Sequence, residues 1–131
     1  MKRQVIRVEL YSTNLERQRM DKIYPVLVAG DFVFVAGLPS FDPVSWEVTR
    51  RPFEQQAELA LGQMKRCLEA VGSLLEQVVK RNIYCTDPAY YGAFNEAYVR
   101  YCPDQAPARI FPCVPCFFGS FDVEADCIAV I

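Results

Sequence analysis

The feature that most constrains the fold is a pair of runs that are apolar at consecutive positions on either side of a turn. Residues 24–29 (Tyr-Pro-Val-Leu-Val-Ala) and 32–36 (Phe-Val-Phe-Val-Ala) flank Gly30-Asp31, which is typical of a tight hairpin. A strand with one solvated face alternates apolar and polar residues, so strands that are apolar throughout need cover on both faces. We therefore predict a sheet with no face left to solvent.

The other patterns predict an α+β domain. Apolar residues at three- and four-residue steps predict a helix over 53–71, closed by Gly72, and Asp87-Pro88 is a good start for a second helix that ends at 103–107. The remaining segments predict strands at 4–10, 78–85, 108–117 and 121–131 and a polar connection at 14–22. Residues 38–52, with an exposed-looking Trp46, predict a loop or a short edge hairpin, and residues 118–120 predict a final hairpin turn. The order is three strands, a helix, a strand, a helix and two strands.

Two helices can cover only one face of such a sheet. The strands at 26–29, 32–36 and 127–131 leave an apolar second face, which predicts a homo-oligomer of closed symmetry. The alternative is that the N-terminal segment packs over this face. With 131 residues and no linker or repeat, we expect one domain over 1–131.

Composition excludes several classes of function. Fourteen Lys and Arg against sixteen Asp and Glu give a net charge of -2, which disfavours nucleic acid or an anionic membrane as a partner. No histidine is present, so a Ser-His-Asp or Cys-His relay and a histidine metal site are excluded. No signal peptide or membrane span is recognisable, which predicts a cytoplasmic protein whose six cysteines are free thiols at mostly buried positions. Cys113 and Cys116 form a C-x-x-C without the context of a redox or zinc motif.

Charged and polar side chains near the C-terminus are the candidates for chemistry. Asp122, Glu124 and Asp126 alternate with apolar residues, which predicts three carboxylates on one side of the last strand. Arg109 begins the preceding strand and is suited to bidentate capture of a carboxylate, either of a ligand or of the neighbouring strand. Asn95 lies among the aromatic residues of the second helix, either in a site or at a solvated edge.

These residues also carry a resemblance to a known family. The motifs are residues 32–37, Gln55-Gln56, 76–80, Cys85-Thr86-Asp87, 90–98, Ala106-Pro107-Ala108-Arg109 and 124–130. In this order, from about residue 24 to 131, the chain resembles the Rid/YjgF family of enamine and imine deaminases. The series Asn-x-x-Tyr, Pro-Ala-Arg and acid-x-Ile-Ala-Val is its most specific part.

The resemblance implies a fold and a reaction. The fold is that of a RidA-like, chorismate-mutase-like domain, a mixed sheet with two helices on one face, that assembles as a homotrimer with clefts between subunits. Arg109 would bind the carboxylate of a small 2-imino or 2-aminoacrylate acid, and Asp126 with the backbone carbonyl of Phe111 would hold the attacking water. Tyr24 and Asn95 would line the cleft. No cofactor or metal is implied, and the products are a 2-oxo acid and ammonia.

Three positions depart from the family pattern. Ala36 stands where a serine is usual and offers only its backbone, Phe111 replaces a common cysteine with a ring, and Asp126 is one methylene shorter than the usual glutamate, which moves the carboxylate by about 1.5 Å. Glu124 or Asp122 could then serve as the acid. The alternatives to a deaminase of small imines are an enzyme for a larger imine or carbonyl intermediate and a non-catalytic trimer that binds small carboxylates.

Overall fold

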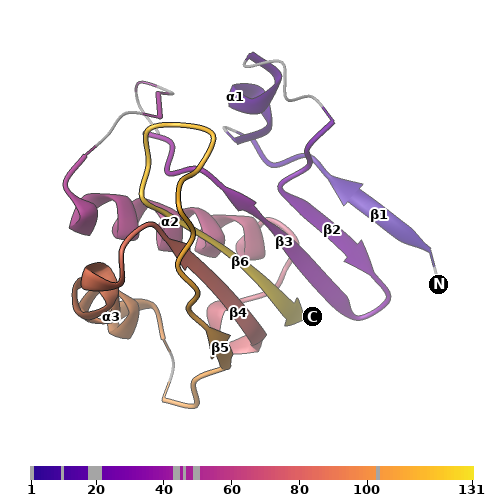
Figure 1. Ribbon diagram of the computed structural model, residues 1–131. Helices are drawn as coiled ribbons and strands as arrows, with labels where there is room; N and C mark the ends of the chain where they lie inside the picture. The colour runs from indigo at the N-terminus through magenta and orange to yellow at the C-terminus, as the bar shows by residue number, and fades with distance from the viewer. Residues whose placement is uncertain are drawn as a thin grey trace.

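A mixed six-stranded sheet forms the body of the described residues, with strand order β1-β2-β3-β6-β4-β5 (Figure 1). The computed structural model describes residues 2–9, 11–17, 22–42, 45, 47–48, 51–102 and 104–131. The strands are β1 (Arg3–Ile6), β2 (Val26–Ala29), β3 (Phe32–Leu38), β4 (Val78–Cys85), β5 (Ala108–Ile110) and β6 (Val123–Val130). The helices are α1 (Tyr11–Arg17), α2 (Phe53–Glu69) and α3 (Tyr91–Tyr98), with short 3-10 turns at Leu75–Gln77, Pro88–Tyr90 and Val99–Tyr101.

The predicted hairpin, first long helix and fourth strand are confirmed. β2 and β3 pair in antiparallel register around Gly30, whose φ of 58° suits a tight turn that other residues adopt with strain. α2 ends near Gly72, which has a φ of 79°. The side chain of Asp87 accepts a hydrogen bond from the Ala89 amide and caps the turn that leads into α3. Trp46 and Pro103 lie outside the described residues.

Two of the predicted segments are wrong. β1 ends at Ile6, and a helix, α1, replaces the start of the predicted polar connection. Apolar residues recur here at helical spacing and are buried: Val8, Tyr11 and Leu15. Their burial stabilises the helix despite the polar residues between them. The C-terminal hairpin is also wrong, because β5 pairs parallel with β4 while β6 lies between β3 and β4.

The sheet has one covered and one open face. Along β6 buried and half-buried residues alternate, and the buried set, such as Cys127 and Ala129, belongs to the core beneath α2 and α3 (Figure 1). On the other side Phe32 and Phe34 keep 45% and 39% of their surface exposed. We call this side the open face; its residues include Phe32, Phe34, Asn82, Tyr84, Glu124, Asp126, Ile128 and Val130.

The described part of the N-terminal segment, residues 2–9 and 11–17, does not cover the open face. β1 extends the sheet as an edge strand beside β2, and Val8, Tyr11 and Leu15 join the core that contains α2. The alternative in which this segment packs over the second face is therefore wrong for the described residues. The apolar residues of the open face are therefore not covered by the described residues, in line with the uncovered apolar face that the sequence predicted.

Candidate functional site

Arg109 is held in a fixed position by α3. Its Nη1 donates to the side-chain oxygen of Asn95 at 2.7 Å, and its Nη2 reaches the Tyr91 hydroxyl at 3.4 Å. The guanidinium carbon lies 4.8 Å from the centre of the Tyr98 ring, within cation-π range. Parallel pairing of β5 with β4 places Arg109 opposite Arg81, on the helix-covered side of the sheet. The sequence-predicted Asn95 and Arg109 are thus brought together.

Phe111 completes an aromatic surround for the guanidinium. Its ring is 5.8 Å from the guanidinium carbon of Arg109 and meets Tyr91 edge to face, with 5.2 Å between ring centres. It also packs on Phe94. The interpretation of Arg109 as an ion-pair partner across a C-terminal hairpin is wrong, because that hairpin does not form and the polar partners of Arg109 are Asn95 and Tyr91.

Glu124 and Asp126 form a second polar group on the open face. In the β4–β6 register Asn82 lies opposite Asp126 and Tyr84 opposite Glu124. The amide of Asn82 donates to Asp126 Oδ1 at 2.7 Å. Burial raises the pKa of Tyr84, and the charge of Asp126 and a hydrogen bond to it raise that pKa further. Asn82 and Tyr84 were not identified from the sequence, since only the strand pairing shows that they face the two carboxylates.

The backbone of β3 gives Glu124 room. A Cβ atom on Gly37 would collide with Glu124 Oε1, so the absence of a side chain at Gly37 lets the carboxyl group approach the β3 backbone. Burial raises the pKa of Glu124 above its ordinary value, and the neighbouring charge of Asp126 acts in the same direction. Glu124 therefore keeps its proton to a higher pH than a solvated glutamate does.

Asp122 does not belong to this acidic group, and its predicted place beside the other two carboxylates is wrong. It lies before β6 and is buried, and its carboxylate accepts hydrogen bonds from Gln56 Nε2 at 3.0 Å and from Thr86 Oγ1 at 3.0 Å. Gln56 Oε1 in turn accepts from the Asp122 amide at 2.6 Å. Asp122 and Gln56 thus tie the beginning of β6 to α2.

Tyr24 precedes β2 and Ala36 lies on β3, away from β4 and from β5, which carries Arg109. The Ala36 amide donates to the carbonyl of Pro25 at 2.9 Å, which brings the residue after Tyr24 against β3. β2 and β3 lie on the opposite side of β6 from β4 and β5. The predicted residues therefore form two groups, one of Arg109, Asn95 and Phe111 and one built on β3 and β6.

A buried cation beside Arg109 was also not recognised from the sequence. Arg81 has no exposed surface, and its guanidinium carbon lies 5.1 Å from the centre of the Tyr98 ring, the ring that Arg109 also contacts. Its Nη2 donates to the Tyr101 carbonyl at 3.1 Å. Its Nε and Nη1 atoms have no hydrogen-bond partner. The Tyr98 ring thus contacts both guanidinium groups.

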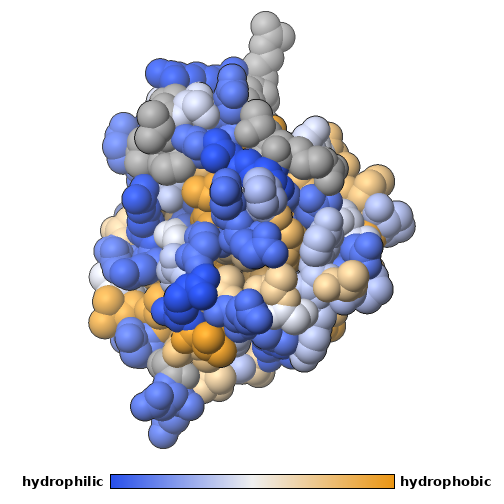
Figure 2. Space-filling model, turned by 90° about the vertical axis from the view of Figure 1, so that its left-hand side faces the viewer, coloured by the Kyte–Doolittle hydropathy of each residue, from blue (hydrophilic) through white to orange (hydrophobic). Residues whose placement is uncertain are grey.

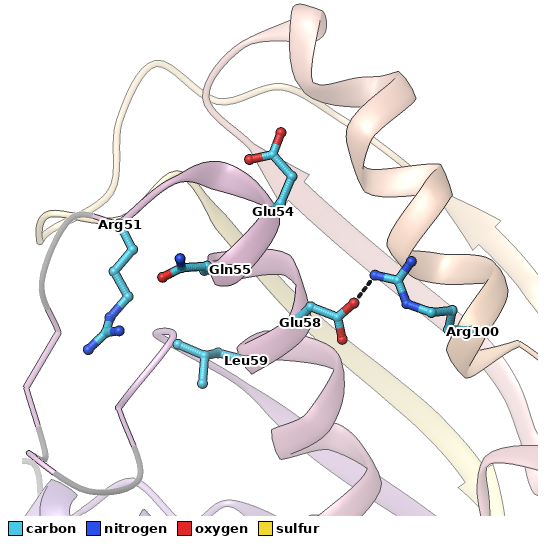
Figure 3. Close-up of a pocket in the computed structure, with 6 residues that line it drawn as sticks. All are labelled: Arg51, Glu54, Gln55, Glu58, Leu59 and Arg100. Atoms are coloured by element: carbon cyan, nitrogen blue, oxygen red, sulfur yellow. Dashed lines mark hydrogen bonds and ion pairs between the residues drawn. The ribbon is translucent and has the colours of Figure 1, made fainter.

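One surface hollow of the described residues is separate from both groups. About 360 Å³ in volume, it lies on α2 and is lined by Arg51, Glu54, Gln55, Glu58, Leu59 and Arg100 (Figure 3). Arg100 pairs with Glu58, and Arg51 pairs with Asp42, so its cations already have partners. Figure 2, which views this end of the molecule, shows mainly hydrophilic side chains with smaller apolar patches between them. None of the predicted site residues lines this hollow.

Two further features of the described residues concern metal sites and membrane spans. No three His, Cys, Asp or Glu side chains among them come together as a metal site. None of their helices combines the length and the apolar character that crossing a membrane requires.

Comparison with known proteins places these features in a family. The family described as Endoribonuclease L-PSP matches residues 24–131. A RutC family protein from Pyrococcus horikoshii is 34% identical over 82 residues, which are 63% of this chain and 65% of that relative. The match thus spans less than two thirds of that relative's length. The chloroplastic Reactive Intermediate Deaminase A of Arabidopsis thaliana is 28% identical over 126 residues, 96% of this chain and 67% of the relative.

Solved structures agree with the fold. RidA from the Antarctic bacterium Psychrobacter sp. PAMC 21119 superimposes with a TM-score of 0.79 at 31% identity, covering 83% of this chain and 88% of that one. Escherichia coli TdcF with bound serine gives a TM-score of 0.77 at 25% identity, covering 83% and 87%. The α+β architecture with one mixed sheet is therefore shared with these proteins.

Proposed function

This chain belongs to the Endoribonuclease L-PSP family, which includes the RidA and YjgF proteins that its motifs resemble, and on that premise we propose that it hydrolyses small 2-imino or 2-aminoacrylate acids to 2-oxo acids and ammonia. The observation that carries the proposal is the immobilised Arg109, with Asn95 and Tyr91 bonded to it. A guanidinium has five N–H donors in a planar fork, so these two contacts leave donors for a substrate carboxylate.

The chemistry suits a chain without histidine. An imine carbon is already electrophilic, so the protein need only orient the substrate, hold a water and move protons. We assign the water to Asp126 and the backbone carbonyl of Phe111. Water adds to the imine carbon and gives a proton to the carboxylate, and the nitrogen of the resulting adduct takes up a proton. The carbon–nitrogen bond then breaks to release ammonia, while the hydroxyl group loses its proton to solvent and becomes the 2-oxo group. No cofactor enters this sequence.

The two groups of residues support a site shared between copies of the chain. Arg109 lies on the helix-covered side of the sheet at β5, whereas Asp126 lies on the open face at β6, two strands away. Each copy would thus contribute Arg109, Asn95 and Phe111 to one cleft and Tyr24, Ala36 and Asp126 to another. A homotrimer with the open faces turned inward would also bury Phe32 and Phe34, which are otherwise exposed.

The test measures ammonia release. 2-Aminoacrylate or 2-iminobutanoate is generated in the assay, and the rate is compared with the uncatalysed rate for the wild type, Arg109→Ala and the control Arg100→Ala. Arg100 is an exposed arginine paired with Glu58 outside both groups. We expect acceleration by the wild type and the control, and loss with Arg109→Ala equivalent to about 1.5–3 kcal/mol of binding. No acceleration by the wild type would reject a deaminase of small imines.

A mixing experiment tests the shared site. Arg109→Ala and Asp126→Asn copies are unfolded together in equal amounts and refolded, with each variant alone as the control. In a ring in which neighbouring copies complete each site, about a quarter of the sites regain both residues by random assembly. Activity that stays at the level of the separate variants would place both residues in one chain's site.

A second candidate function is binding of small carboxylates without turnover. Phe111 favours it, because a ring occupies the position beside Arg109 where the family commonly has a smaller side chain. Calorimetric titration with 2-oxobutanoate and benzoate, alongside the rate assay, separates the two. Binding without acceleration supports the second candidate, and turnover excludes it. Activity confined to a larger imine would instead indicate an enzyme of one particular pathway.

A further inference from the structure

Two cysteines from distant parts of the chain lie side by side. Cys85 ends β4 and Cys113 follows β5, and their sulfur atoms are 3.7 Å apart. The two residues form a parallel bridge: the Cys85 amide donates to the Pro112 carbonyl at 3.2 Å, and the Val114 amide donates to the Cys85 carbonyl at 2.8 Å. Backbone hydrogen bonds on both sides of the pair therefore keep the two side chains adjacent.

This arrangement suits a disulfide. Neighbouring strands lie about 4.8 Å apart, inside the range of about 4.4–6.8 Å between Cα atoms that a disulfide spans. The sulfur atoms need to approach from 3.7 Å to about 2.05 Å, a movement that side-chain rotation can supply without displacing the hydrogen-bonded backbone. The Sγ atom of Cys85 also donates to the carbonyl of Asp87 at 3.3 Å, which fixes its position beside Cys113.

The two thiols differ in access to solvent. Cys113 is exposed, whereas Cys85 is buried at the end of its strand. The expectation that the cysteines occupy mostly buried positions is wrong for Cys113 and for Cys116, which is exposed as well. Burial raises the pKa of Cys85 to about 11, so it stays protonated near neutral pH. An oxidant in solution therefore meets Cys113 first.

We propose that Cys85 and Cys113 form a reversible oxidation site, at which hydrogen peroxide converts the two thiols into a disulfide. In the first step the sulfur of Cys113 attacks the peroxide, the O–O bond breaks, and a sulfenic acid and water form. In the second step the sulfur of Cys85 attacks the sulfenic sulfur, the S–O bond breaks, and the thiol proton leaves with the hydroxide as water. One peroxide is reduced to two waters while the two thiols are oxidised.

The cross-link would act on the segment next to the proposed site. Cys113 follows Phe111 and Pro112, and the short strand β5 that carries Arg109 ends at Ile110. A covalent bond from β4 to Cys113 would restrain this segment, which otherwise has only the three paired residues of β5 and the Cys85–Cys113 bridge to hold it to β4. Oxidation would then raise the thermal stability of the chain.

The test is peptide mapping of the folded protein. Wild type is treated with stoichiometric hydrogen peroxide, remaining thiols are alkylated in denaturant, and the protein is digested without reductant. We expect a Cys85–Cys113 cross-linked peptide, two hydrogens lighter than the separate thiols, a Tm higher by several degrees, and reversal of both by dithiothreitol. A Cys113–Cys116 disulfide, a cross-link between chains, or no oxidation while an unfolded control is oxidised would each overturn the proposal.

Two variants serve as matched controls. Cys116→Ser keeps the proposed pair and should form the same cross-link at a similar rate. Cys85→Ala should stop the reaction at the sulfenic acid of Cys113, which dimedone traps as a mass adduct. Loss of the cross-link in Cys116→Ser would show that Cys116, rather than Cys113, reacts first with the peroxide.

Discussion

Gln56 should be one of the most important single side chains for stability, although it takes no part in the proposed reaction. It is 1% exposed, and its amide group makes three hydrogen bonds: from Nε2 to Asp122 Oδ2 at 3.0 Å, from Nε2 to the Arg51 carbonyl at 2.8 Å, and from the Asp122 amide to Oε1 at 2.6 Å. These bonds join the start of α2 to the start of β6, the strand that carries Glu124 and Asp126.

Gln56→Met keeps the length of the side chain and removes all three hydrogen bonds. One involves a carboxylate, worth about 1.5–3 kcal/mol, and two are neutral, worth about 0.5–1.5 kcal/mol each. Because the Asp122 amide would lose its Gln56 partner in a buried position, we expect the free energy of unfolding to fall by about 3–5 kcal/mol. Few point substitutions have an effect this large.

The measurement is urea denaturation at fixed protein concentration, because assembly makes apparent stability depend on concentration. Gln55→Met is the matched control: Gln55 is the exposed neighbour, and its substitution should change the free energy of unfolding by less than about 0.5 kcal/mol. An unchanged m-value would show that the denatured states are comparable. A loss below about 1 kcal/mol in Gln56→Met would refute the assignment of Gln56 as the tie between α2 and β6.

Three further predictions concern the charged groups. Gly37→Ala displaces the Glu124 carboxyl and should lower ammonia release by about 10²-fold, with little change in calorimetric affinity for 2-oxobutanoate. Arg81→Met removes a buried cation with two unpartnered nitrogens and should raise the free energy of unfolding by about 1–4 kcal/mol, measured in urea. Because the pKa of Glu124 is raised in the folded state, the stability of the wild type falls as pH rises from about 4.5 to that raised value. Glu124→Gln has no such titration, so the Tm of the variant minus the Tm of the wild type should be larger at about pH 8 than at about pH 4, in matched thermal melts.

Local patterns predicted the elements whose residues repeat strongly. The hairpin at Gly30, the helix after Phe53 and the strand that ends at Cys85 were all predicted near their observed bounds, because turn chemistry and periodicity act within a few residues. The α1 helix was missed because its seven residues carry few apolar side chains, and it is stabilised by burial of Tyr11 and Leu15 in the core.

Strand pairing was the part that the sequence could not provide. Residues 108–110 and 123–130 read as neighbours joined by a turn, but β6 pairs with β3 and β4, and only three residues of β5 join the sheet beside β4. A strand pattern shows which residues share a face and not which strand lies beside it. The roles of Asn82 and Tyr84, and the separation of Arg109 from Asp126, depend on that pairing and were therefore not predictable from periodicity.

Because the chain has no histidine, the carboxyl groups of Glu124 and Asp126 on the open face are the candidates for proton transfer in the proposed reaction. Imine hydrolysis needs a group that accepts a proton from water and a group that gives one to nitrogen, and histidine often does both near neutral pH. Asp126 accepts a hydrogen bond from Asn82, which suits the role that we propose for it as the acceptor of a proton from the attacking water. Glu124, two residues away on the same face, holds its proton to a higher pH because of burial and the charge of Asp126. Two acids in unequal surroundings can thus divide a task that one histidine performs elsewhere.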